Sequence, residues 1–318
     1  MSLKESSRKI IVTSALPYAN AALHLGNILE LVQTDIWVRF QRLIGNECTY
    51  VCADDAHGTP IMLKAEELNK SPEDLIQEVY KEHKETFDLF NISTDNFHTT
   101  HSDENRELLE LIFNQLDQNG LIETRTIKQL YDAEKGIFLS DRYIKGTCPK
   151  CKSTDQYGDN CEVCSATYEA TELIDPISVL SKTTPKIRDT EHLFFRLSTL
   201  KDSIHEWISN SSVQSQVINK LSEWLDGDLR DWDISRDEPY FGFPIPGHKG
   251  KYFYLGAHFS ESGSPLFHRK CLLWRTNARF LNPHCGKEIS LWSTPHRPGC
   301  QVVLLITPPP GVPRGGIV

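Results

Sequence analysis

Two Cys-x-x-Cys turns in the middle of the chain constrain its fold more than any other feature. Their thiols are those of Cys148, Cys151, Cys161 and Cys164. Each turn presents two thiolates on one side of a tight loop, so the pair supplies the four sulfurs of a tetrahedral zinc site. Four cysteine ligands leave no open coordination position, so we expect one structural Zn²⁺ that holds a turn-rich segment together. A redox-active Cys-x-x-Cys pair and four unrelated thiols are the alternatives.

Length and composition indicate a water-soluble protein of two domains. The chain has 318 residues, of which 39% are hydrophobic and 24% charged, and single cores usually stop growing near ~250 residues. The first residues, MSLKESSRK, lack the apolar run of a signal peptide, and no apolar stretch approaches the ~20 residues that cross a bilayer. We therefore expect a cytosolic protein without membrane contact, whose nine cysteines are thiols or metal ligands rather than disulfides.

The first third of the chain alternates between strand and helix patterns. Buried strands are expected at 8–14 and 47–53. Helices are expected at 25–43, after Pro60, at 71–90 with Ser71 as the cap, and at 103–118. The first of these helices is predicted by the spacing of four apolar residues, Leu29, Val32, Ile36 and Phe40. This alternation predicts a Rossmann-like parallel α/β sheet.

The pattern divides the chain into four parts: the first half of a Rossmann-like α/β domain (1–119), a zinc-binding connective insertion of short strands and turns (120–199), a return segment with helices at about 199–226 (200–254), and a divergent tail (255–318). The net charge of -9 combines an acidic body with a basic tail. An acidic body argues against a broad nucleic-acid surface, so RNA contact is expected only at a local basic patch or outside this chain.

The loop between the first strand and the first helix has the composition of a phosphate site. In an open parallel sheet, ligands bind at the carboxyl ends of the strands, beside a helix amino terminus. Gly26 lets a nucleotide approach the backbone, while His24 and Asn27 share one helix face and can donate to phosphate oxygens. Taken alone, the tetrad is short, and a histidine that caps the helix or packs against it is the alternative.

Five segments that follow one another along the chain favour a functional role for this loop over a purely structural one. They are SALPYANAALHLGN, CADDAHGTPIMLKAEE, NISTDNFHTTH, KGTCPKCKSTDQYGDNCEVC and EWLDGDLRDWDISRDEPYFGFPIP. Over residues 8–254 the chain closely resembles the methionyl-tRNA synthetases of bacterial type, which are class I aminoacyl-tRNA synthetases. Its HLGN tetrad matches the HIGH signature of that class, with Asn27 at the last position.

The resemblance implies a role for each matching residue. Leu16 and Tyr18 would line the methionine pocket, and Asp55 would hold the substrate ammonium. A surface or helix-capping aspartate is the alternative for Asp55, and the neighbouring Asp54 and His57 are expected to be structural. Arg236 would assist at the substrate carboxylate or at a phosphate, because its planar fork suits either anion. His24, Gly26 and Asn27 would bind ATP, with His24 and Asn27 as the catalytic pair.

The reaction that the resemblance implies is attack of the methionine carboxylate on the α-phosphate of ATP, followed by transfer of the methionyl group to tRNA(Met). Mg²⁺ would enter with ATP. After KYFY the sequence departs from the family: it continues LGAHFSESGSPLF, and it has no KMSKS-like segment, anticodon-binding domain or dimerisation region.

We interpret the departure near Tyr254 as a shift of reading frame, which makes the tail irregular or disordered and unable to replace a sheet strand, and which impairs activity. A genuine divergent ending is the alternative. A catalytically inactive synthetase fragment and a non-catalytic module that binds zinc and a nucleotide are the competing functions.

Overall fold

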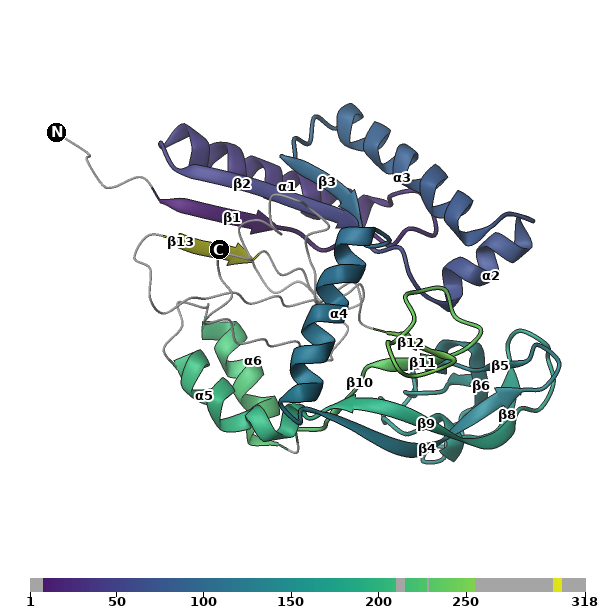
Figure 1. Cartoon of the computed structure of the whole chain (residues 1–318). Helices are drawn as coiled ribbons and strands as arrows, with labels where there is room; N and C mark the ends of the chain where they lie inside the picture. Colours follow the sequence, from purple (N-terminus) through teal and green to yellow (C-terminus); the bar gives the residue numbers. More distant parts are fainter. Residues whose placement is uncertain (1–7, 210–214, 228, 255–299, 305–318) are drawn as a thin grey trace.

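The computed structural model describes residues 8–209, 215–227, 229–254 and 300–304. A parallel sheet in the order β13-β1-β2-β3 forms one side of the molecule (Figure 1). Its strands are β1 (Lys9–Thr13), β2 (Glu47–Asp54), β3 (Asn96–Thr99) and β13 (Cys300–Leu304). All neighbouring pairs run parallel. The predicted α/β class with a parallel sheet is confirmed.

Four helices follow these strands: α1 (Leu25–Leu43), α2 (Thr59–Glu67), α3 (Pro72–Leu89) and α4 (Asp103–Gln118). They lie where the sequence predicts them, because local side chains fix where they begin. Ser71 Oγ accepts the amide hydrogen of Asp74 at the start of α3, which confirms the predicted cap. Proline in the first turn of α2 and of α3 has the φ that a helix needs there.

The apolar spacing that predicts α1 does not mark its buried face. Ile36 is 61% and Phe40 52% exposed, whereas polar residues turn toward the sheet. They are tolerated there because they are paired. Glu30 Oε1 accepts the amide of Ala15, and Asp35 Oδ1 accepts the amide of Ser93. Periodicity therefore gives the helix but not its orientation, because the inward face holds loops by hydrogen bonds as well as packing.

The insertion is carried on a long antiparallel ribbon rather than on the short strands that we expected. Its two strands are β4 (Ile122–Asp132) and β9 (Lys186–Phe195), and they pair from Ile122↔Phe195 to Tyr131↔Lys186. The polar and apolar alternation along β4 fits a ribbon with one buried face. The remaining elements are β5 (Ile137–Phe138), β6 (Ile144–Thr147), β7 (Gln156–Tyr157), β8 (Ile174–Ser178) and the 3₁₀ turns Asp141–Tyr143, Ala170–Glu172 and Leu197–Leu200.

The return segment packs the ribbon onto α4, which spans the distance between the parallel sheet and the ribbon in Figure 1. It contains α5 (Lys201–Ser209), α6 (Ser215–Asp226), β10 (Trp232–Asp233), β11 (Ser235–Asp237) and β12 (Lys251–Phe253). Phe113 of α4, Phe195 of β9 and Phe253 of β12 share one buried cluster. The helices predicted near 199–226 are confirmed in the described residues.

The tail contributes one described element. β13 pairs with β1 from Lys9↔Cys300 to Thr13↔Leu304, so the expectation that the tail supplies no strand to the sheet is wrong for these five residues. Their sequence, CQVVL, contains a β-branched pair that the composition of the whole tail obscures. The expectation of irregular structure at 255–299 and 305–318 falls outside the described residues. Within the described ranges, no helix combines the length and apolarity required to cross a bilayer.

Candidate active site and metal centre

The four thiols of the insertion converge on one point. Their sulfur atoms all lie within 4.8 Å of one another, and those of Cys151 and Cys161 are 3.5 Å apart and those of Cys148 and Cys164 3.9 Å apart. A tetrahedral zinc with Zn–S bonds of ~2.3 Å places its sulfurs ~3.8 Å apart. The observed separations bracket this value, so small side-chain shifts would bring all four sulfurs onto one ion, and the convergence predicted from the spacing is confirmed.

The two turns have the same local structure. The amide of Cys151 donates to Cys148 Sγ over 3.5 Å, and the amide of Cys164 donates to Cys161 Sγ over 3.4 Å. Hydrogen bonds of this kind favour the thiolate, which is the form that binds metal. The residue after each second cysteine, Lys152 or Ser165, has a positive φ, so the chain turns back around the metal position.

The loop after β1 and the end of β2 meet through their backbones. Asp55 donates its amide hydrogen to Pro17 O and accepts one from Ala19, both over 2.8 Å, and Tyr18 and Asp55 form a parallel bridge. The Asp55 side chain is half-buried and that of Leu16 is buried in the sheet core. The structure thus brings together three residues predicted for the methionine pocket, at the carboxyl edge of the sheet.

Two tyrosine hydroxyls converge beside this edge. A Cβ atom built on Gly58 would lie 2.9 Å from Tyr18 Oη and 3.7 Å from Tyr240 Oη, and Gly58 has a φ of 120°. Its amide donates to Phe241 O over 2.8 Å, which holds the return segment against the loop after β2. Burial raises the pKa of Tyr18 and of Tyr240, and the nearby Asp55 carboxylate adds to both shifts, so both phenols stay neutral at neutral pH.

His24 caps α1, which was the alternative to a purely catalytic role. Its Nδ1 accepts the amides of Gly26 and Asn27 over 3.1 and 3.3 Å, and Asn27 Oδ1 accepts the amide of His24 over 3.2 Å. A Cβ at position 26 would meet the His24 ring at 2.9 Å, so any larger residue would displace the ring from its capping position. Since Nδ1 accepts, the neutral ring carries its proton on Nε2.

Asp54 is buried in the core, rather than at the surface or at a helix cap as expected. Its Oδ1 pairs with His83 Nδ1 over 2.8 Å, and His83 Nε2 reaches Ala21 O over 2.8 Å. Burial opposes protonation of His83, but the bonds to two acceptors outweigh it and raise its pKa. This pair fixes α3 to the carboxyl end of β2 and to the loop before α1.

Arg236 lies on β11, close to the tyrosines. Its Nη1 donates to Asp233 Oδ2 over 3.1 Å and to Ser235 O over 2.6 Å, and its guanidinium carbon lies 3.4 Å from the ring centre of Tyr254. The charges of Arg236 and Asp55 both act on the pKa of Tyr240, in opposite directions. Tyr240 therefore lies within electrostatic reach of both predicted ligand-binding charges.

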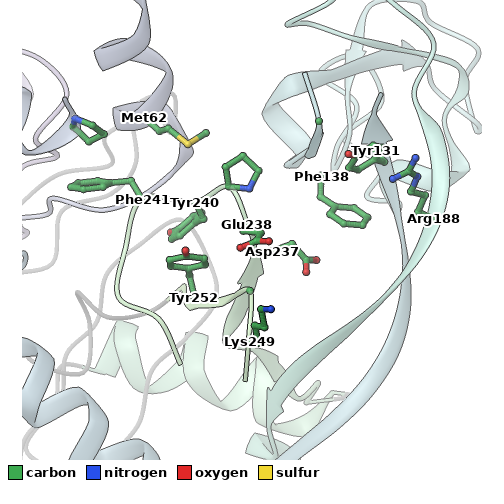
Figure 2. Close-up of a pocket in the computed structure, with 14 residues that line it drawn as sticks. Met62, Tyr131, Phe138, Arg188, Asp237, Glu238, Tyr240, Phe241, Lys249 and Tyr252 are labelled. Carbon is green, nitrogen blue, oxygen red and sulfur yellow. The ribbon is translucent and has the colours of Figure 1, made fainter. Parts of the chain in front are cut away.

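An open groove of about 790 Å³ lies between the return segment and the insertion. Figure 2 shows Tyr240 and Tyr252 on one side and Tyr131, Phe138 and Arg188 on the other. The Arg188 guanidinium lies over the Tyr131 ring at 3.7 Å. The groove thus offers aromatic faces and a cation next to Tyr240.

His57 is structural, as expected. Its Nε2 shares a 2.9 Å hydrogen bond with His101 Nδ1, and its ring lies edge-on to Phe243 with centroids 4.7 Å apart. Burial lowers the pKa of His57 to about 3, and the neighbouring His101 adds to the effect. Burial also lowers the pKa of His101. The pair is therefore neutral at neutral pH, and it packs the return segment against the loop after β2.

Sequence reasoning missed Tyr240 and Gly58. Both lie in segments quoted for the family resemblance, but only their contact across the fold gives them a place in the site. The aromatic run at 240–243, FGF preceded by Tyr240, was the available signal, because such a cluster beside a charged WDISRD segment suits a half-buried site wall.

Comparison with known families agrees with this arrangement. The family model described as tRNA synthetases class I (M) matches residues 10–257, which is more than half of the chain. The chain therefore belongs to the class I tRNA synthetases, in the group that the model marks M.

Two solved structures share the fold. The crystal structure of Mycobacterium tuberculosis methionyl-tRNA synthetase bound by methionyl-adenylate is 21% identical, with a TM-score of 0.60, and the match covers 82% of this chain and 50% of that one. A second structure of the M. tuberculosis enzyme, in complex with methionyl-adenylate, is 22% identical with a TM-score of 0.59, covering 82% and 49%. The chain spans about half the length of these proteins.

Proposed function

We propose that this chain is the amino-terminal catalytic region of a methionine–tRNA ligase. It would join the carboxylate of methionine to the α-phosphate of ATP and then pass the methionyl group to tRNA(Met). The observation that carries the proposal is the meeting of Tyr18, Asp55 and Tyr240 at the carboxyl edge of a parallel sheet. Open α/β sheets bind their ligands at this edge, and the family to which the chain belongs supplies the chemistry.

The amino-acid half of the site would use charges at two places. The Asp55 carboxylate would pair with the ammonium of methionine, and the Arg236 guanidinium would bind the carboxylate or the α-phosphate. Leu16 and the two neutral tyrosines would surround the thioether with apolar ring and chain atoms.

The ATP half would be formed by the start of α1. His24 would donate its Nε2 hydrogen to a phosphate oxygen, because Nδ1 is occupied by the cap. Asn27 uses Oδ1 in the same cap, so its Nδ2 amide can donate as well, and Gly26 would let the phosphates approach the backbone. Mg²⁺ would arrive on the ATP oxygens. A carboxylate oxygen attacks phosphorus and pyrophosphate leaves, so the residues act by orientation and charge stabilisation, without a covalent enzyme intermediate.

The four-cysteine cluster would hold one structural Zn²⁺ through Cys148, Cys151, Cys161 and Cys164. Four thiolates saturate the ion, so it would organise the insertion rather than react. The groove beside Tyr240 would admit the unpaired end of tRNA, because bases of any kind can stack on Tyr131, Phe138 and Tyr252. A cytosolic location accords with reduced thiols.

Methionine-dependent exchange of pyrophosphate into ATP tests the proposal. We expect exchange with methionine that exceeds exchange with leucine by at least about tenfold, since pocket contacts discriminate side chains by ~1–3 kcal/mol. The rate should be low, because residues 255–318 depart from the family pattern. Replacing Phe138 by Ala should leave exchange unchanged and slow transfer to tRNA(Met). Exchange that is independent of methionine would contradict the proposal.

The departure at 255–318 favours a second candidate, a module that binds its ligands without forming the adenylate. Calorimetric titration separates the two functions. Binding of methionine and ATP without exchange would support the second candidate, and binding of neither ligand would remove both.

A further inference from the structure

His192 occupies an unusual position between two carboxylates. It lies on β9 of the insertion ribbon and has no exposed side-chain surface. Its Nδ1 lies 2.7 Å from Asp233 Oδ2 and its Nε2 lies 3.0 Å from Asp237 Oδ2. The two aspartates flank Arg236 in the sequence, on β10 and β11.

The geometry determines the charge of the ring. A carboxylate can only accept hydrogen bonds, so a neutral imidazole would turn one lone pair toward an aspartate oxygen. Both contacts are satisfied only when both nitrogens donate. Burial alone would lower the pKa of His192, but the hydrogen bonds that its ring donates to Asp233 and Asp237 outweigh burial and raise the pKa. The ring is therefore an imidazolium.

The same aspartates also bind the other cations of the cluster. Asp233 Oδ2 accepts from Arg236 Nη1 over 3.1 Å. Asp237 Oδ1 accepts from Lys251 Nζ, and its Oδ2 accepts from Thr190 Oγ1 over 2.8 Å. The hydrogen-bonded cluster thus holds three cations against two carboxylates.

Charges on the neighbouring elements do not change this balance directly. Arg125 stands opposite His192 in the ribbon register, and its guanidinium is bound by Glu123 and Asp231. Burial raises the pKa of the Asp141 carboxyl group in the insertion, and the charge of Arg236 lowers it by a smaller amount. The charge that is left over in the cluster is therefore one positive charge.

We propose that His192 is a positioning residue for Arg236: by sharing the charge of Asp233, it leaves the guanidinium available to an anionic ligand group. Without the imidazolium, Asp233 would pair with Arg236 alone and the cluster would be neutral. The anionic group would be the carboxylate or the phosphate assigned to Arg236 above, so the identity of the ligand, but not the sharing of charge, rests on the proposed function.

Chemical modification of Arg236 tests the sharing of charge without any substrate. Phenylglyoxal attacks arginines that are not engaged by carboxylates, and peptide mass mapping of the full chain measures its rate at Arg236. We expect His192→Gln to lower this rate at least threefold. We expect the double variant His192→Gln/Asp233→Asn to recover most of it, because removing one negative charge restores the surplus. A residue that acts only by packing would not be rescued by a second disruption.

Binding provides the second readout. His192→Gln should weaken the binding of methionine or of ATP about tenfold. If Arg236 binds the carboxylate of methionine, His192→Gln should change the affinity for methioninol, which lacks this carboxylate, by less than twofold. If the wild-type chain binds neither methionine nor ATP, the proposed function fails, while the modification rates still decide the role of His192. An unchanged Arg236 rate in His192→Gln, a double variant no faster than the single one, or a His192 ring that NMR shows to be neutral at pH 7 would overturn the inference.

Discussion

The four-cysteine cluster and the Tyr18–Asp55–Tyr240 pocket are built on opposite principles. The cluster comes from one short segment, its sulfurs are within 4.8 Å of one another, and the small insertion around it has only a modest apolar core of its own. The pocket is assembled from three distant segments, which larger cores hold in place. Order in the insertion should therefore depend on a bound metal ion, whereas order in the pocket should depend on packing.

Removing the metal should have the largest effect. Binding of a structural zinc is worth on the order of 10 kcal/mol, so chelation, or replacement of both Cys148 and Cys161 by serine, should unfold the insertion locally. Hydrogen exchange should then rise strongly at 144–178 and stay unchanged at 47–54. Elemental analysis should find one zinc per chain, and Cys48→Ser should retain it. Zinc retained in full by the double serine variant would contradict the assignment.

Substrate binding should show that the pocket has two halves. Asp55→Ala should weaken methionine binding by about 10- to 100-fold, the ~1.5–3 kcal/mol of a charge-assisted hydrogen bond, with a much smaller effect on ATP. His24→Ala should do the reverse. Titration calorimetry measures both constants, and Asp88→Ala, an exposed acid on α3, is the control. Equal losses for both ligands in both variants would indicate general misfolding instead of two subsites.

Gly58 should reveal how closely the pocket is packed. At Gly58→Ala the new Cβ meets Tyr18 Oη at 2.9 Å, while at Gly45→Ala, also at positive φ, nothing lies within 4 Å. Both changes carry a backbone cost of at least ~1 kcal/mol, which is larger at Gly58 because its φ of 120° and ψ of 164° are almost restricted to glycine. The contact with Tyr18 should add ~1–3 kcal/mol at Gly58. Urea unfolding measures the difference. Equal losses of unfolding free energy at the two positions would show that Tyr18 and Tyr240 move aside at no energetic cost.

The smallest effect should be one of pH. The pKa of His83 is raised in the folded state, so its stabilisation is complete below the unfolded pKa of ~6.5 and is lost as pH rises through the folded value. The stability difference between wild type and His83→Gln should therefore shrink from pH 6 to pH 9, by at most ~1.4 kcal/mol per pH unit. Thermal melting at these pH values checks the trend, and a difference that grows with pH would contradict the raised pKa of His83.

The same contrast separates what could be predicted from what could not. Spacing alone predicted the cysteine cluster. Spacing together with local signals such as the Ser71 cap predicted the helix boundaries, because these features depend on neighbours in the sequence. The inward face of α1, the long ribbon β4–β9 and strand β13 were not predicted, since each depends on a partner elsewhere in the chain. The predicted division at 119, 199 and 254 stays a prediction.

In the site, the resemblance named Tyr18 and Asp55, and the structure places them side by side. It did not name Tyr240 or His192. A tyrosine in an aromatic run and a histidine on a strand are common in cores, and only the distances to Gly58 and to two aspartates distinguish them.

The most direct test of the pocket is titration of a non-hydrolysable methionyl-adenylate analogue into the full chain. A single ligand that fills both halves should bind at least about 100-fold more tightly than methionine or ATP alone, because analogues of activated species gather both sets of contacts. Both Asp55→Ala and His24→Ala should weaken its binding. An analogue that binds no better than methionine, or that is indifferent to one of the two variants, would contradict a single site formed by the sheet edge and the start of α1.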